Sequence, residues 1–264
     1  MNAENKTTRF RILFIVITGL FTALTYFATA VFVFPITASG GGFFLGEMMI
    51  YIAAFSFGPY VAGFAGGVGS ALADVISGTY AAWAPGTLAI KFAEGFVVGY
   101  LFKKLKNLDE EKEQDPKGTV IKLLSGFLMS LLIVIFGIAY LPSAFLVFVL
   151  LSIVFLLTML ITMYVIKRNV LRFIIPLLCG CAIMVVGYLI YGLYAFNSLD
   201  NLIHSGSEPV VNYGAFLEIL YNILQCFVGI VISIPVYQAI KKSKILDYYY
   251  LYSENETKID EKSG

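Results

Sequence analysis

Residues 60–78 read YVAGFAGGVGSALADVISG, and this stretch decides the class of fold. Its only side chain that is charged at neutral pH is Asp74. It is long enough to cross a bilayer, because a helix rises 1.5 Å per residue and about 20 residues cover roughly 30 Å of hydrocarbon. The whole chain is 59% hydrophobic and 13% charged, against roughly 45–50% and 25% in soluble domains. A soluble fold of 264 residues cannot bury so much apolar surface, so the sequence predicts an all-α integral membrane protein embedded in the lipid bilayer.

Similar apolar runs lie on both sides of this stretch, and together they predict about eight membrane spans. Gly58-Pro59 separates the second run from the third, because proline begins a helix more easily than it continues one. The predicted spans are 11–34, 46–57, 60–78, 87–102, 120–140, 143–166, 171–194 and 213–239.

The basic residues predict the orientation of the spans. All of the 18 Lys and Arg residues except Lys91 fall in segments that an eight-span chain places on one side. The loops at 35–45, 79–86, 141–142 and 195–212 hold none. Cytoplasmic loops carry an excess of Lys and Arg, so we expect both termini to be cytoplasmic and the protein to lie in the cell membrane of a prokaryote.

The charged segment Lys103–Gly118 divides the chain. We expect five segments: the first four spans in 1–104, a cytoplasmic linker in 105–118, a two-span hairpin in 119–166, the last two spans in 167–242, and a cytoplasmic tail in 243–264. The charge run indicates a solvated linker.

Two pairs of small residues predict close helix contacts. Gly63 and Gly67 have GxxxG spacing, which favours packing against a neighbouring span. Gly19 and Ala23 have the same spacing, and from spacing alone they could serve either a neighbouring span or a separate membrane subunit.

Polar residues inside the predicted spans indicate a cavity. An ionisable residue within a span costs roughly 2.5–3.5 kcal/mol on insertion scales, so each needs a partner or a wet cavity. In the predicted topology five of them lie in the outer half of the membrane: Glu47, Asp74, Lys91, Glu94 and Glu218. Glu218, Asn222 and Gln225 share one helical stripe. The set could be a structural ion-pair network, but taken together it favours a polar cavity that opens outward.

The adjoining loops are rich in aromatic residues, including Phe44, Tyr80 and the only tryptophan, Trp83. Such rings suit a flat heteroaromatic ligand whose polar edge is bound by Asn, Gln, Lys and Glu side chains. The sequence has no G-x-x-x-x-G-K-[ST] phosphate loop. It offers no histidine-based metal site, no catalytic nucleophile set, no cofactor motif and no nucleic-acid-binding signature, and we expect it not to be an enzyme.

Several ordered motifs resemble the S components of energy-coupling-factor (ECF) transporters, in the branch that includes riboflavin-, hydroxymethylpyrimidine- and pyridoxine-type proteins. The motifs are Gly40-Gly-Gly-Phe-Phe-Leu-Gly-Glu47, Phe57-Gly-Pro59, Gly67-x-Gly-Ser-Ala-Leu-Ala-Asp74 with Ser77-Gly-Thr-Tyr80, Trp83-Ala-Pro85 with Lys91-x-x-Glu94-Gly95, Gly187-Tyr188, and Glu218-x-x-x-Asn222-x-x-Gln225.

This resemblance implies a six-helix bundle that binds a B-vitamin or a vitamin precursor at the outer face for ATP-driven uptake. It implies two kinds of partner, a transmembrane coupling subunit and two cytoplasmic ATPases, as in an ABC transporter. It gives Gly19 and Ala23 the role of contacting the coupling subunit. The hairpin at 119–166 is then an insertion. The substrate-binding residues that we expect are Phe44, Glu47, Tyr80, Trp83, Lys91, Glu94, Tyr188, Glu218, Asn222 and Gln225.

Two other functions stay open on the sequence alone. A stand-alone secondary transporter could relay protons through Glu47, Asp74 or Glu94, although no inverted repeat is visible. An intramembrane enzyme could use Asp74 and Glu94 as an acid–base pair. The sequence does not distinguish riboflavin from pyridoxine or a pyrimidine as the substrate.

Overall fold

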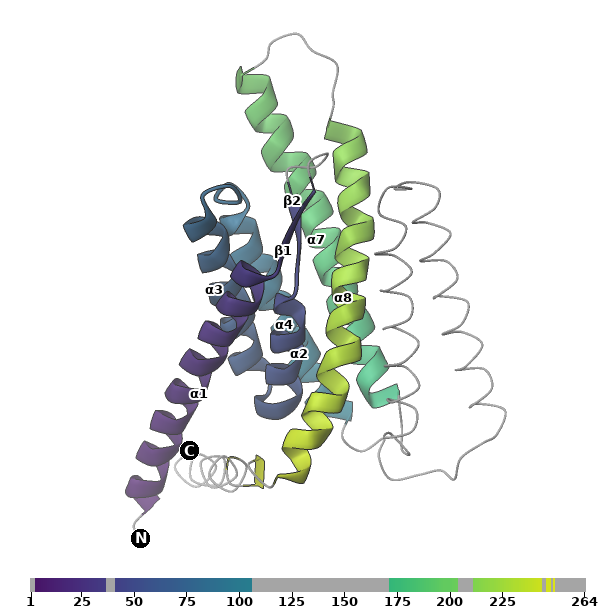
Figure 1. The fold of residues 1–264 in the computed structure, drawn as a ribbon. Coiled ribbons are helices and arrows are strands. Elements are labelled where there is room, and N and C mark those ends of the chain that lie inside the picture. Colours follow the sequence, from purple (N-terminus) through teal and green to yellow (C-terminus); the bar gives the residue numbers. More distant parts are fainter. Residues whose placement is uncertain are drawn as a thin grey trace, which may run out of the picture. The chain divides into compact units, whose positions relative to one another are not determined.

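The computed structural model describes residues 3–36, 41–105, 171–203, 211–243, 246–247 and 249. Within this part the chain is mostly helical (Figure 1). The helices are α1 (Ala3–Val31), α2 (Gly46–Phe57), α3 (Pro59–Ser77), α4 (Ala84–Lys104), α7 (Leu171–Ile203) and α8 (Val211–Lys242). The predicted spans at 120–140 and 143–166 lie outside the described residues.

Four of these helices have a segment long and apolar enough to cross a membrane: Thr8–Val31, Pro59–Ser77, Arg172–Gly192 and Tyr221–Lys242. α2 is apolar but shorter. α4 carries four charged side chains along its length. An all-helical membrane bundle therefore describes most of this part of the chain, and the number of spans stays a prediction.

The part of the chain between α1 and α2 differs from the prediction. The first apolar run was expected to stay helical through residue 34, but α1 ends at Val31 and a two-stranded antiparallel hairpin follows. Strand β1 (Val33–Ile36) pairs with β2 (Gly41–Phe44), so that Val33 lies opposite Phe44. The physical reason is local: Pro35 has no N–H to continue a helix, and valine and phenylalanine favour extended structure.

Close glycine contacts hold the first helices together. A Cβ atom added at Gly67 would lie 2.7 Å from the carbonyl oxygen of Leu88 on α4. One added at Gly69 would lie 2.7 Å from the carbonyl oxygen of Thr22 on α1. α3 therefore packs its backbone against α4 on one face and α1 on the other, and the predicted GxxxG face is confirmed as a helix-packing surface.

The remaining helices enclose the other side of α2 and α4. α2 contacts α8 as well as α3 and α4. A Cβ atom added at Gly187 of α7 would lie 2.9 Å from Ile90 of α4, which places α7 directly on α4. α2 is the most enclosed element, with Tyr51 and Ala53 fully buried, and its first turn therefore faces the interior of the bundle.

Candidate functional site

Three ionisable side chains form a buried network between α2 and α4. The Lys91 ammonium donates to Oε1 of Glu47 and, at 3.1 Å, to Oε2 of Glu94. The Tyr51 hydroxyl donates to Oε1 of Glu94 at 2.6 Å. All three charged side chains are at most 5% exposed, and a buried charge is tolerated only when it is paired and hydrogen-bonded. The network therefore places two carboxylates against one ammonium.

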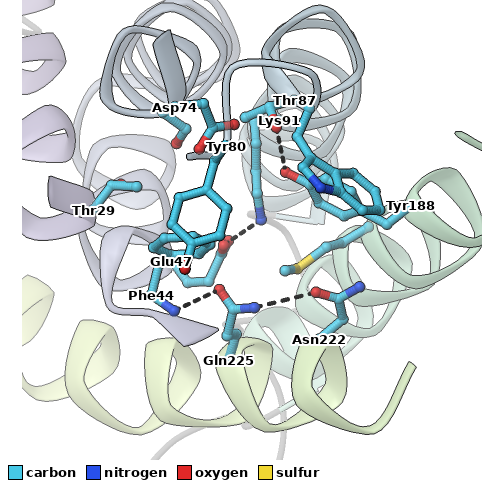
Figure 2. Close-up of a pocket in the computed structure, with 13 residues that line it drawn as sticks. Thr29, Phe44, Glu47, Asp74, Tyr80, Thr87, Lys91, Tyr188, Asn222 and Gln225 are labelled. Carbon is cyan, nitrogen blue, oxygen red and sulfur yellow. Dashed lines mark hydrogen bonds and ion pairs between the residues drawn. The ribbon is translucent and has the colours of Figure 1, made fainter. Parts of the chain in front are cut away.

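Two amide side chains of α8 face this network (Figure 2). Gln225 accepts a hydrogen bond from the backbone N–H of Phe44 at 3.1 Å, which ties α8 to β2. Its Nε2 atom donates to Oδ1 of Asn222 at 3.1 Å. The two residues lie three positions apart, so one helical face presents both amides to the cavity.

Aromatic rings form two further walls. The Phe44 and Tyr80 rings meet edge to face with centroids 5.2 Å apart. On the opposite side the ring centroids of Trp83 and Tyr188 lie 6.0 Å apart. The centroid of the Tyr188 ring is 5.4 Å from the Lys91 ammonium. This distance allows a cation–π interaction. Tyr188 is further fixed by a 3.0 Å hydrogen bond from its hydroxyl to Thr87.

The α3–α4 corner contributes a second carboxylate region. Asp74 is buried in the last turn of α3. The Ser77 hydroxyl donates to the Asp74 carbonyl at 2.7 Å and accepts from the backbone N–H of Tyr80 at 3.2 Å. Burial and, to a smaller degree, the nearby Asp74 carboxylate raise the pKa of the Tyr80 hydroxyl. Tyr80 therefore stays a neutral donor at physiological pH.

These walls line a cavity of about 30 Å³, room for little more than water molecules. It is lined by Thr29, Phe44, Glu47, Ser70, Asp74, Tyr80, Trp83, Thr87, Lys91, Met184, Tyr188, Asn222 and Gln225. A second cavity of about 230 Å³ lies between α1 and α3. Thr29, Phe44 and Tyr80 line both cavities.

The structure brings most of the expected substrate-binding residues together. Eight of them line the small cavity: Phe44, Glu47, Tyr80, Trp83, Lys91, Tyr188, Asn222 and Gln225. Glu94 is fully buried and lies behind Lys91 rather than on the cavity wall. The side chain of Glu218 lies outside the described residues. Gly19 and Ala23 lie on the exposed face of α1.

Five of the residues on the cavity wall were not among the expected substrate-binding residues: Thr29, Ser70, Asp74, Thr87 and Met184. Three of them lie four positions before a polar or aromatic residue that the sequence did draw attention to. Ser70 precedes Asp74, Thr87 precedes Lys91, and Met184 precedes Tyr188. Residues at i and i+4 share a helix face, and that spacing was the available signal. Thr29 carries no such signal.

The comparison with protein families matches residues 9–167 to the ECF-type riboflavin transporter, S component. The match includes 119–166, the segment interpreted above as an insertion. An uncharacterized protein in gap 3'region from Pyrococcus woesei is 55% identical over 73 residues, which are 28% of this chain and 48% of that protein. The chain thus spans about half the length of this curated relative.

No solved structure matches the chain. The family match covers more than half of the sequence, and it agrees with the motifs around Glu47, Asp74 and Lys91 that suggested the same family. The matched family is described as a transporter component and not as an enzyme. The chain belongs to the S components of ECF-type riboflavin transporters.

Proposed function

We propose that this protein is the substrate-capture subunit of an ECF-type ABC importer and that its substrate is riboflavin or a closely related B-vitamin. The observation that carries the proposal is the cavity, which combines aromatic walls with a buried ammonium, two carboxylates and two amides. Aromatic rings suit a flat heterocycle, and the polar groups suit its hydrogen-bonding edge.

The size of the cavity implies a conformational change on binding. A flavin cannot occupy about 30 Å³, so binding requires the Phe44–Tyr80 pair to separate. The adjoining cavity of about 230 Å³ provides space for that movement. The edge-to-face ring contact is one of the interactions that this movement would break.

The placement of charge supports an outward-facing site. On α4 the cavity residue Lys91 lies near the start, and Lys103 and Lys104 lie in the last turn. On α8 the amides lie in the first half, and Lys241 and Lys242 end the helix. Each helix therefore carries its cavity residues away from its basic end, which the positive-inside rule assigns to the cytoplasm.

The exposed side of α1 supports a separate partner surface. Nothing lies within 4 Å of a Cβ atom added at Gly19. The neighbouring Ile15, Val16 and Leu20 are each more than half exposed. Small residues among bulky ones allow a partner helix to approach closely, so we assign the surface around Gly19 and Ala23 to the transmembrane coupling subunit, which works with two cytoplasmic ATPases.

Titration of riboflavin into the purified protein tests the substrate directly. Trp83 is the only tryptophan in the sequence and lines the cavity, so binding should quench both its fluorescence and that of the flavin. Asn222→Ala should weaken binding about 10-fold, as expected for the loss of one to two hydrogen bonds. Ser243→Ala, just beyond the basic end of the same helix, is the matched control and should bind normally. Pyridoxine and hydroxymethylpyrimidine serve as competitors. If one of them binds and riboflavin does not, the substrate is reassigned to the compound that binds.

Uptake in cells tests the coupling. Cells that carry this chain together with an ECF coupling subunit and its ATPases should accumulate riboflavin, whereas cells with this chain alone should not. Accumulation by the chain alone, dissipated by a protonophore, would instead favour the proton-coupled secondary transporter.

A further inference from the structure

Glu47 is the one member of the buried network with an unused oxygen. Both oxygens of Glu94 accept hydrogen bonds, one from Tyr51 and one from Lys91. Oε1 of Glu47 accepts from Lys91. Oε2 of Glu47 is fully buried and has no hydrogen-bond partner. The two carboxylates therefore share the same ammonium but differ in one respect: Glu47 has an oxygen without a partner, and Glu94 does not.

An unsatisfied carboxylate oxygen is costly in the interior of a protein. Desolvating such an atom without a partner carries a penalty larger than that of a neutral group. Glu47 is only 2% exposed, so bulk water does not satisfy this oxygen. Glu47 also lines the cavity, whereas Glu94 does not. The missing partner is therefore one that enters the cavity.

The groups beside Glu47 define what this partner must look like. The Lys91 ammonium also reaches the cavity and can only donate. A ligand that meets both residues must therefore present a donor to Glu47 next to an acceptor for Lys91. Heterocycles with a ring N–H beside a carbonyl have this pattern.

We infer that Glu47 determines specificity by accepting a hydrogen bond from a ring N–H of the ligand, with Lys91 donating to the adjacent carbonyl. This inference rests on the proposed function and extends it to one contact. In riboflavin the matching group is the imide N–H of the isoalloxazine ring, which lies between two carbonyls. An analogue without that N–H leaves Oε2 of Glu47 unpaired, and a site built around a hydrogen bond rejects such an analogue strongly.

The test compares riboflavin with 3-methylriboflavin, in which a methyl group replaces the imide hydrogen. Dissociation constants for both are measured with the wild-type protein, with Glu47→Gln and with Glu94→Gln. We expect the wild type to bind 3-methylriboflavin at least 10-fold more weakly, as for a hydrogen bond to a charged group. Glu47→Gln should lose most of this discrimination, mainly because its affinity for riboflavin itself falls.

The two variants distinguish a direct contact between Glu47 and the ligand from the effect of removing a negative charge and from steric exclusion of the methyl group. Each removes one carboxylate from the same lysine, but only Glu47 lines the cavity. Glu94→Gln should therefore keep the ratio of the two dissociation constants, even where both change. Glutamine has nearly the shape of glutamate, so a purely steric rejection of the methyl group would persist in Glu47→Gln and would overturn the inference.

The comparison of riboflavin with 3-methylriboflavin on the wild-type protein does not depend on whether the variants fold. Equal binding of the two flavins by the wild type refutes the role of Glu47 while leaving riboflavin as the substrate. If riboflavin itself does not bind, the proposed substrate is wrong and the assignment of its imide group is wrong with it.

Discussion

Removing the Lys91 ammonium should destabilise the protein far more than a typical substitution. Lys91→Met has a similar length, but it leaves Glu47 and Glu94 facing each other without a cation, and both are buried. Breaking a buried ion pair by removing one partner costs about 3–5 kcal/mol. At about 2–4 °C per kcal/mol for a chain of this order of size, the apparent Tm should fall on the order of 10 °C.

The fluorescence of Trp83 reports this change, because the ring lies beside the network and no other tryptophan contributes. Thermal unfolding would be followed in detergent, without ligand, for Lys91→Met and for a triple variant that adds Glu47→Gln and Glu94→Gln. Replacing all three charges removes the unpaired carboxylates, so the triple variant should regain much of the lost stability. A Tm for Lys91→Met within about 2 °C of the wild type would mean that the ammonium does not stabilise the bundle, and the reasoning would fail.

Three further perturbations address other parts of the structure. Gly67→Leu should lower the apparent Tm, because even a Cβ atom there would lie 2.7 Å from the Leu88 carbonyl oxygen. Such overpacking costs about 1–3 kcal/mol. An unchanged Tm would contradict the α3–α4 contact. Tyr51→Phe removes the 2.6 Å hydrogen bond to Glu94 and should cost about 1.5–3 kcal/mol, measured by denaturation in detergent. Ala23→Leu should abolish ATP-driven riboflavin uptake while the isolated protein binds riboflavin normally; full uptake would place the coupling surface elsewhere.

The helical part of the fold followed closely from the sequence. α2 occupies the predicted 46–57, and α3 differs from the predicted 60–78 by one residue at each end. These boundaries were predictable because Gly58-Pro59 is a strong local signal: Gly58 has φ 90°, a conformation that favours glycine, and proline follows at the first position of α3.

The β hairpin was not predictable by the same reasoning. Hydropathy does not change between α1 and β1, because Val33 and Phe34 continue the apolar run of the helix. A short apolar segment fits a strand or a helix equally well. Its pairing partner lies beyond Gly40, and the pairing between Val33 and Phe44 is a tertiary fact that a search for single spans does not consider.

The charged members of the buried network were predictable from the sequence, but their connections were not. Ionisable groups are rare in spans, so Glu47, Lys91 and Glu94 stand out from the sequence alone. The sequence gives only one link between them, the i, i+3 spacing of Lys91 and Glu94. Whether Glu47 or Glu94 faces the cavity depends on how α2 crosses α4, and no spacing within one helix contains that information.

The glycines of α3 supply the missing constraint, although none of them lines the small cavity. A Cβ atom added at Gly66 would lie 2.9 Å from the Lys91 carbonyl oxygen and 3.1 Å from Ile50 of α2. The absence of a side chain there lets α4 approach α3 at the residue that carries the ammonium, while α2 packs against the same position. This approach keeps Lys91 within reach of Glu47. The small residues and the charged residues therefore act together. The glycine face sets the distance between the helices, and that distance allows one lysine to bridge two carboxylates. One oxygen of Glu47 then remains for the ligand.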